Sequence, residues 1–265
     1  MQRTLSLLAF VMVMAASLAA QQGGPGGQAP QTPRAQAPID LAGTWVSVIT
    51  EDWRFRMVTP PKGDFASLPL NDAGQKAGQA WDPDKDIAAG EPCKAYGAPG
   101  LMRMPTRLRI SWENDTTLTV ESDAGTQVRR FVFGTAPAGE PSWQGSSVAR
   151  WETQPEGQGV APGGGGGGGG RGGPQLSGGL RVVTTNLRAG YLRRNGAPYS
   201  EKSVYTEYFD RVPGPNKDEW LIVTSVLEDP TYLNQPLMLS THFKREPDAS
   251  KFSPRPCEVT APVTR

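Results

Sequence analysis

The chain has 265 residues, of which 37% are hydrophobic, and it carries 27 Lys and Arg against 26 Asp and Glu. This balance leaves no excess of basic residues that would bind nucleic acid or an anionic membrane surface, so we expect neither as a partner. Single β-rich domains of about 200 to 250 residues are common, so the length does not require two domains.

Residues 1–20 have the features of a secretory signal peptide. Arg3 supplies a positive start, Leu5–Met14 an apolar core, and Ser17–Ala20 the small residues of a cleavage site. No later run of about 18 apolar residues follows, so we expect no integral membrane segment. We therefore predict an exported protein, periplasmic or extracellular, in which residues 21–38, rich in Gly, Gln and Pro, form a disordered tether.

The chain contains two cysteines, Cys93 and Cys257. In an oxidising compartment a disulfide between them is the natural interpretation, with two free thiols or a metal or redox role as alternatives. The bridge would join the segment Pro92–Gly100, which we expect to be a loop, to the end of the domain. We place a single domain at residues 39–257 and expect residues 258–265 to be a disordered tail.

The first elements of this domain are two predicted strands and one short helix. Gly43–Thr50 is rich in β-branched and aromatic residues, and Trp53–Val58 alternates apolar with cationic residues, as in strands. Asn71 is a suitable helix N-cap, and Asp82-Pro83 should end the helix.

Further strands are expected along the rest of the domain. They are Arg107–Trp112, Thr117–Glu121, Gln127–Phe133, Ser146–Glu152, Leu180–Thr185, Ser203–Phe209, Glu219–Leu227 and Leu237–Lys244. Residues 153–179 include eight consecutive glycines at 163–170, which indicate a flexible insertion. About nine or ten strands with hairpin-length loops predict an all-β fold, an antiparallel meander closing into a barrel, with a β-sandwich as the alternative.

Two resemblances add to this prediction. Gly43-Thr44-Trp45 resembles the Gly-x-Trp opening of lipocalin-type barrels, in which the tryptophan packs across the closed floor. The mature chain is also similar to a family of uncharacterised secreted bacterial β-rich proteins. The pieces that carry the second resemblance are Pro69-Leu70-Asn71, Ala80–Pro83, Cys93 with Gly97-Ala98-Pro99, Gln127–Arg130, Gly145–Glu152, Gly196–Glu201 and Glu228-Asp229-Pro230. The lipocalin resemblance implies a lipocalin-like barrel, whereas the family implies no particular activity.

His242 is the only histidine, and it shares a predicted strand face with Met238, Ser240 and Lys244. It could act as a general base or a metal ligand, or it could be a surface or cavity histidine bonded to a neighbour. One histidine without a nearby cysteine pair lacks the usual ligands of a zinc site. We therefore expect no metal and no cofactor.

Amphipathic residues form the larger group of candidates. Those that we expect at a ligand-binding site are Trp53, Arg56, Arg150, Trp151, Glu207, Tyr208 and His242. Alternate strand positions face the inside of a barrel, where arginines could hold a carboxylate through paired hydrogen bonds. The alternative is that these arginines lie on the solvent face of the sheet.

The leading functional hypothesis is a secreted or periplasmic protein that binds a small amphipathic molecule. A second hypothesis is a lipocalin-like enzyme, of hydratase or isomerase type, in which Glu207 or His242 donates a proton. A third is an envelope structural or interaction module, which would carry an exposed apolar patch instead of a cavity.

Overall fold

The computed structural model describes residues 31–136, 138–155 and 176–263, and the elements below belong to the unit that begins at Thr32. The predicted signal peptide, the tether up to residue 30 and the run of glycines lie outside the described residues. The predicted domain boundaries therefore stay predictions. Among the described residues, no helix is long and apolar enough to cross a membrane.

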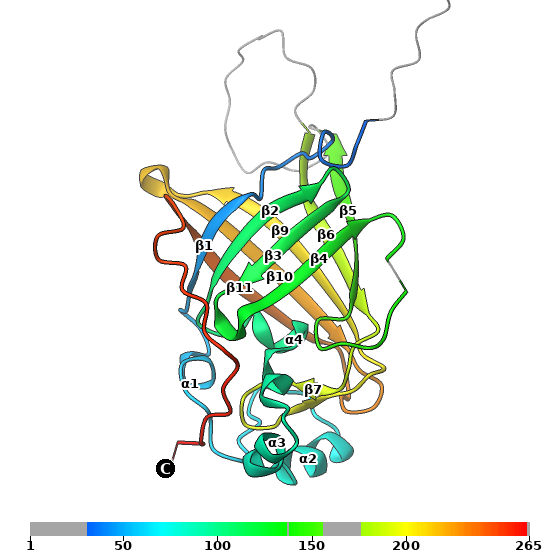
Figure 1. Ribbon diagram of the computed structural model, residues 1–265, viewed down its shortest axis with the longest axis vertical. Coiled ribbons are helices and arrows are strands. Elements are labelled where there is room, and N and C mark those ends of the chain that lie inside the picture. The colour runs from blue at the N-terminus through cyan, green and yellow to red at the C-terminus, as the bar shows by residue number, and fades with distance from the viewer. Residues whose placement is uncertain (1–30, 137, 156–175, 264–265) are drawn as a thin grey trace, which may run out of the picture. The chain divides into compact units, whose positions relative to one another are not determined.

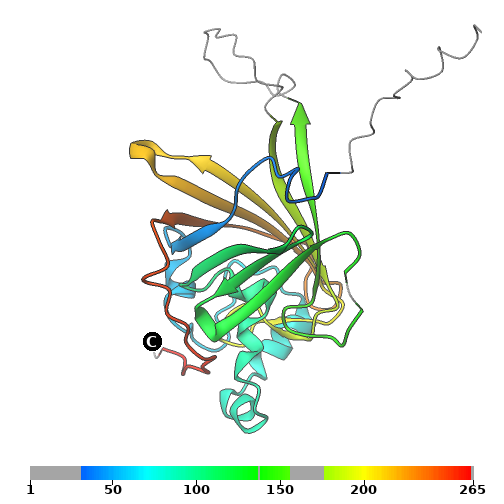
Figure 2. The same cartoon turned by 45° about the horizontal axis from the view of Figure 1, so that its top comes forward.

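Nine strands of the described chain close into one barrel (Figures 1 and 2). They are β1 (Gly43–Val48), β2 (Arg107–Asn114), β3 (Thr117–Ser122), β4 (Gln127–Phe133), β5 (Ser146–Pro155), β6 (Leu176–Thr185), β9 (Val204–Pro213), β10 (Glu219–Glu228) and β11 (Leu237–Glu246). Each strand pairs with its predecessor in the barrel, and β11 pairs with β1. The two-residue strands β7 (Gly190–Tyr191) and β8 (Pro198–Tyr199) form a separate hairpin. This confirms the all-β barrel and sets aside the sandwich.

One pair of strands departs from the predicted antiparallel meander. β4 and β5 are parallel, with Phe131 opposite Ser147 and Phe133 opposite Ala149. A closed ring with an odd number of strands cannot alternate in direction everywhere, so at least one pair must be parallel. The prediction of a wholly antiparallel barrel is therefore wrong at this pair, because the connection from β4 returns the chain to the end at which β4 began.

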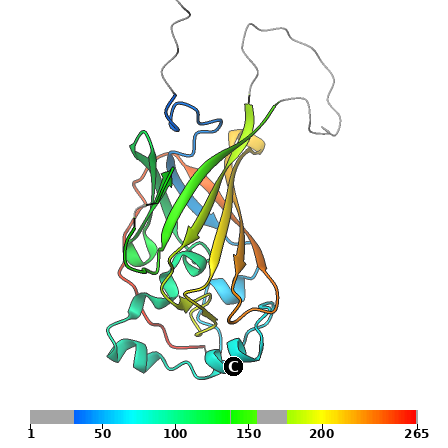
Figure 3. The same cartoon turned by 90° about the vertical axis from the view of Figure 1, so that its right-hand side faces the viewer.

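Four α-helices occur in the described ranges where one was predicted. They are α1 (Trp53–Arg56), α2 (Asp72–Gln79), α3 (Pro83–Ala88) and α4 (Ala98–Leu101), accompanied by the 3₁₀ turns η1 (Pro92–Tyr96), η2 (Ala124–Thr126) and η3 (Pro215–Lys217). The helix predicted after Asn71 is confirmed as α2, and the Asn71 side chain accepts a hydrogen bond from the Gly74 amide at 2.9 Å. The helices gather at one end of the barrel, here called the basal end (Figures 1 and 3).

The helices α3 and α4 were not predicted, because each has a proline in its first turn, a residue that was interpreted as the end of a helix or as part of a loop. The helix α2 ends before Asp82-Pro83, as predicted. Asp82 also accepts a hydrogen bond from the Asp84 amide, and Pro83 is the first residue of α3. Proline suits the first position of a helix, where no amide partner is needed. Pro99 likewise lies in the first turn of α4, inside the segment predicted as a loop.

The predicted strand Trp53–Val58 is wrong, because this segment contains the short helix α1. Asp52 adopts a left-handed backbone conformation, with φ of 51°, which turns the chain away from the direction of β1. Arg56 is only 3% exposed, whereas Trp53 is 65% exposed. The alternation of apolar and cationic residues therefore does not mark two faces of a sheet, since tertiary contacts of Arg56 override the local pattern.

Inward-facing side chains fill the middle of the barrel. Trp45 is fully buried, its Nε1 donates to the Leu41 carbonyl at 3.0 Å, and the Arg245 guanidinium lies 5.6 Å from its ring. At the end opposite the helices, Ile39 packs against this core, and Trp151 Nε1 donates to the Pro33 carbonyl at 2.7 Å. A site for a ligand must therefore be sought at the barrel ends or on its outer face.

The predicted disulfide between Cys93 and Cys257 is confirmed. It joins η1 to the segment that follows β11, and this segment runs along the outside of the barrel toward the basal end (Figure 1). Beyond the bridge, Thr260 contacts Thr59 through their hydroxyl groups, and the Val263 amide donates to the Thr59 carbonyl at 3.0 Å.

Candidate functional site

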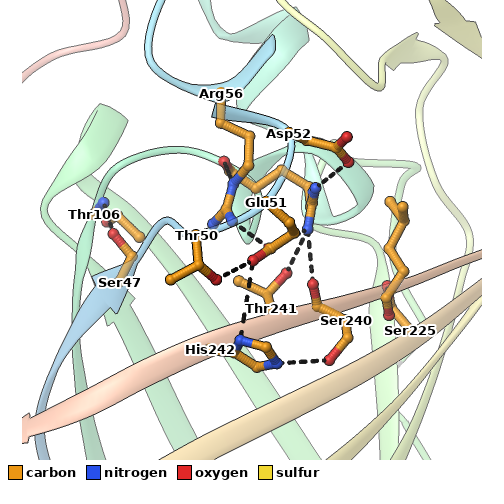
Figure 4. Close-up of polar contacts among 12 residues, drawn as sticks. Ser47, Thr50, Glu51, Asp52, Arg56, Thr106, Ser225, Ser240, Thr241 and His242 are labelled. Carbon is orange, nitrogen blue, oxygen red and sulfur yellow. Dashed lines mark hydrogen bonds and ion pairs between the residues drawn. The ribbon is translucent and has the colours of Figure 1, made fainter. Parts of the chain in front are cut away.

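The predicted site residues lie in three different places. Arg56 and His242 lie at the basal end, on either side of Glu51 (Figure 4). Trp53 is on the same helix as Arg56 but is largely exposed. The structure therefore brings together two of the predicted residues around an acidic residue that the sequence did not single out.

Two predicted residues lie on the outer side of the barrel, and one lies near the opposite end. Arg150 is exposed and pairs with Glu152 at 2.9 Å, and Tyr208 contacts Arg181 from the neighbouring strand. Trp151 packs against the rings of Trp112 and Phe133. These three residues do not contribute to the basal cluster.

Glu207 lies inside the barrel and is fully buried. Its carboxylate receives two hydrogen bonds from the Arg129 guanidinium, at 2.9 and 2.5 Å. Burial disfavours a charged Arg129, but the adjacent Glu207 carboxylate outweighs this effect and raises the pKa of Arg129. Both oxygens of Glu207 are thus bonded to Arg129 in the barrel core, so the geometry does not favour the hypothesis of Glu207 as an internal acid.

The basal cluster fills a gap in the barrel wall. β1 ends at Val48, opposite His242, whereas β11 continues to Leu237 and has no β1 partner over its remaining residues. Arg103 occupies this edge. Its Nη1 donates to the Ser240 carbonyl at 2.8 Å and to Thr241 Oγ1 at 3.3 Å, and its Nη2 donates to Asp52 at 2.8 Å.

Arg103 was missed in the sequence because it follows the unpredicted helix α4 and belongs to no periodic segment. Its role depends on contacts with residues distant in sequence, and the local pattern around it contains no signal for them.

Glu51 is the acidic centre of the cluster. Arg56 Nη1 donates to its Oε1 at 2.6 Å, and Thr50 Oγ1 donates to its Oε2 at 2.7 Å (Figure 4). Arg103 Nη1 reaches the same Oε1 at 3.3 Å. Partial burial would raise the pKa of Glu51, but the Thr50 hydrogen bond and the charges of Arg56, Arg103 and His242 outweigh it and lower that pKa.

His242 contacts both a hydroxyl and a carboxylate. Its Nε2 lies 3.2 Å from Ser240 Oγ, and its Nδ1 lies 4.0 Å from Glu51 Oε2 (Figure 4). A serine, a histidine and an acid in this sequence of contacts resemble a hydrolase triad. The 4.0 Å between His242 Nδ1 and Glu51 Oε2 is too long for a hydrogen bond, however. Ser240 and His242 are alternate residues of one strand and therefore neighbours on its face. The arrangement is adequately explained as a surface polar network.

A small cavity of about 30 Å³ lies beside this cluster at the basal end. Its apolar lining comes from Phe55, Leu68, Pro99, Met104, Leu192, Leu237 and Leu239, and its charged lining from Asp52, Arg56, Arg103, Arg193 and Arg194. Such a volume holds one or two water molecules or a group of similar size. The cavity therefore combines an apolar wall with a strongly cationic one.

Two arginines that line this cavity each have a buried guanidinium nitrogen, Arg56 Nη2 and Arg193 Nη1, with no hydrogen-bond partner among the described residues. Burial lowers the pKa of Arg56 to about 10, with a further contribution from the charge of Arg103. Burial also lowers the pKa of Arg193 to about 10. The guanidinium of Arg193 lies 3.9 Å from the centre of the Phe55 ring. Both arginines remain cationic at neutral pH.

A second hollow, of about 460 Å³, lies on the outer side of β5, β6 and β9, where Gly178 and Gly179 leave space beside Tyr208. Burial and the nearby Glu152 raise the pKa of Asp210 at its edge. This hollow lies next to residues outside the described ranges. Within those ranges, no group of three or more His, Cys, Asp or Glu side chains could hold a metal ion.

No protein-family model and no curated protein sequence matches this chain.

Proposed function

We propose that this protein is an exported binding protein for a small amphipathic molecule, and that the polar group of the molecule enters the basal cavity while its apolar part covers the leucines at the cavity's opening. The observation that carries the proposal is the composition of the cavity, in which leucine side chains face guanidinium groups. Ligand sites in proteins are commonly apolar concavities with a few fixed polar groups that orient the ligand.

The apolar wall is built by well-ordered elements. Leu237 and Leu239 project from β11, and Leu192 follows β7. These residues, together with the half-buried Leu68, belong to one hydrophobic cluster at the basal end. A ligand that covers this wall would remove apolar surface from water, and each Å² removed would contribute about 25 cal/mol to the free energy of binding.

The charged wall is held in place by contacts with the protein itself. Arg103 is fixed by β11 and Asp52, and Arg194 Nη2 donates to the Arg56 carbonyl at 3.0 Å. Because these side chains are already oriented, binding would not require ordering them, and such preorganisation favours affinity.

The disulfide supports export, since structural disulfides persist in oxidising compartments. The apolar residues that fill the barrel interior argue against a ligand in its centre. These observations support the basal cavity as the ligand site.

The proposal is tested by native mass spectrometry of the mature protein purified gently from its own host's envelope. We expect a stoichiometric small molecule that is lost in Leu239→Trp, which fills the cavity. Met238→Trp is the matched control, because Met238 is the preceding residue on β11 and is 67% exposed. The control should retain the molecule. A protein that is empty, and that takes up nothing from an extract of the envelope, would contradict the proposal.

A further inference from the structure

We infer that the polar group of the bound molecule is a carboxylate, received by Arg56 and Arg193. This inference rests on the proposed function and adds to it the chemical class of the ligand. It depends on which hydrogen-bond donors at the cavity are already occupied and which are not.

Most donors of the cationic wall are occupied. Arg103 donates to Ser240, Thr241, Asp52 and Glu51, and Arg194 donates to the Arg56 carbonyl. Arg56 itself donates through Nε to the Arg103 carbonyl at 2.8 Å and through Nη1 to Glu51. These contacts hold the guanidinium groups of Arg56, Arg103 and Arg194 in place.

Within the described ranges, two guanidinium nitrogens of the arginines that line the cavity have no acceptor for their hydrogen bonds. Nη2 of Arg56 and Nη1 of Arg193 are both buried, and in the part of the chain that the structure describes neither has an acceptor. Arg56 carries the stronger argument, because its side chain is only 2% exposed. A buried donor without a partner destabilises the protein, and more so when the group is charged. An acceptor that enters the cavity would remove this destabilisation at both residues.

The number and charge of these donors indicate the chemistry of the acceptor. A carboxylate presents two acceptor oxygens, one for each of these two donors. Four arginines and one aspartate line the cavity, so a negative charge would be attracted to it. A volume of about 30 Å³ suits a group of this size.

The carboxylate alone fills the cavity, so the remainder of the ligand would lie at its opening, where an apolar group would cover Leu68, Leu237 and Leu239. A monocarboxylic acid with a short hydrocarbon chain therefore satisfies both walls. Hexanoate is a suitable probe, and hexanamide is its neutral analogue of nearly the same shape.

The test compares the binding of hexanoate and hexanamide to the full mature protein by isothermal titration calorimetry. We expect hexanoate to bind at least ten times more tightly than hexanamide. Arg193→Gln should weaken the binding of hexanoate at least tenfold and change that of hexanamide little. Arg56→Gln should do the same where it folds, although it also removes a partner of Glu51.

Arg54→Gln is the matched control. Arg54 lies on α1 next to Arg56, and its removal causes the same change in net charge. It pairs with Asp64 at 3.2 Å and does not line the cavity. We expect this variant to bind hexanoate as the unaltered protein does.

The possible failures are distinguishable. Equal binding of hexanoate and hexanamide, or equal losses in Arg193→Gln and Arg54→Gln, would overturn the carboxylate inference and leave the proposed function intact. A protein that binds neither probe, and that arrives without a small molecule from the envelope, would overturn both.

Discussion

Arg129 and Glu207 form a doubly hydrogen-bonded ion pair across the interior of the barrel, where the two side chains are 1% and 0% exposed. Arg129 comes from β4 and Glu207 from β9, so the pair joins strands that are not neighbours in the barrel. The rings of Phe131 and Tyr205 lie beside the guanidinium, at 4.9 and 5.9 Å from its carbon. Because both charges are removed from water, each is stabilised mainly by the other.

We predict that Glu207→Gln lowers the free energy of unfolding by about 3 to 5 kcal/mol, because it leaves the Arg129 charge buried without its partner. Urea unfolding followed by circular dichroism measures this change. The double variant Arg129→Met/Glu207→Leu should recover most of the loss, since it removes both charges together. A loss below about 1 kcal/mol in the single variant would show that the pair is not isolated from water.

Only part of this structure could be predicted from the sequence. Strands such as Gln127–Phe133 and Glu219–Leu227 carry a strong local alternation, and β4 and β10 begin and end within one residue of those predictions. The face of β11 that carries His242 was also predicted correctly, since Met238 on that face is 67% exposed, whereas Leu237 and Phe243 on the opposite face are buried.

The basal site could not be predicted in the same way. Arg56 was singled out, but on a strand that is in fact the helix α1, and Glu51, Arg103 and Arg193 were not singled out at all. Their functional relation arises where β1 ends before β11 does. That mismatch is a property of strand register in the closed barrel, and no local sequence pattern encodes it.

Gly196→Ala tests the packing of the basal helices. Gly196 has φ of 81°, and a Cβ there would lie 2.1 Å from Cγ of Trp81. Trp81 cannot move freely, because its Nε1 donates to Asp86 at 3.0 Å. We predict a loss of about 3 to 5 kcal/mol in the free energy of unfolding, from backbone strain and overpacking together.

Gly63→Ala is the control for that variant. Gly63 has φ of 79°, and a Cβ there would meet nothing within 4 Å. It should therefore show the backbone cost alone, about 1 to 2 kcal/mol, in the same urea experiment. Equal losses in the two variants would contradict the role assigned to Trp81.

Reduction of the Cys93–Cys257 bridge should lower stability substantially. The two cysteines are 164 residues apart, and in the chain-entropy model a loop of this length is worth about 5 kcal/mol. The double variant Cys93→Ser/Cys257→Ser should match the reduced protein in urea unfolding and should be cleaved faster by protease in residues 247–263. Unchanged cleavage there would mean that contacts such as those of Thr59 hold the segment without the bridge.

The lowered pKa of Glu51 makes stability dependent on pH. A carboxyl whose pKa is lower in the folded than in the unfolded state stabilises the fold above its ordinary value of 4.5, and this contribution is lost as the pH falls through the folded value. Urea unfolding from pH 3 to 7 should therefore show a weaker loss toward acid in Glu51→Gln than in the unaltered protein. Parallel curves would show that Glu51 does not contribute.

Hydrogen exchange of the backbone amides, measured by mass spectrometry with and without hexanoate, tests directly whether the basal cavity is the binding site. Binding at the basal cavity predicts slower exchange in residues 52–57 and 192–194, which carry Asp52, Arg56, Arg193 and Arg194 of its charged wall, and unchanged exchange in residues 32–42 at the opposite end. Slower exchange confined to residues 32–42, or no change at saturating hexanoate, would contradict the claim that the basal cavity is the binding site.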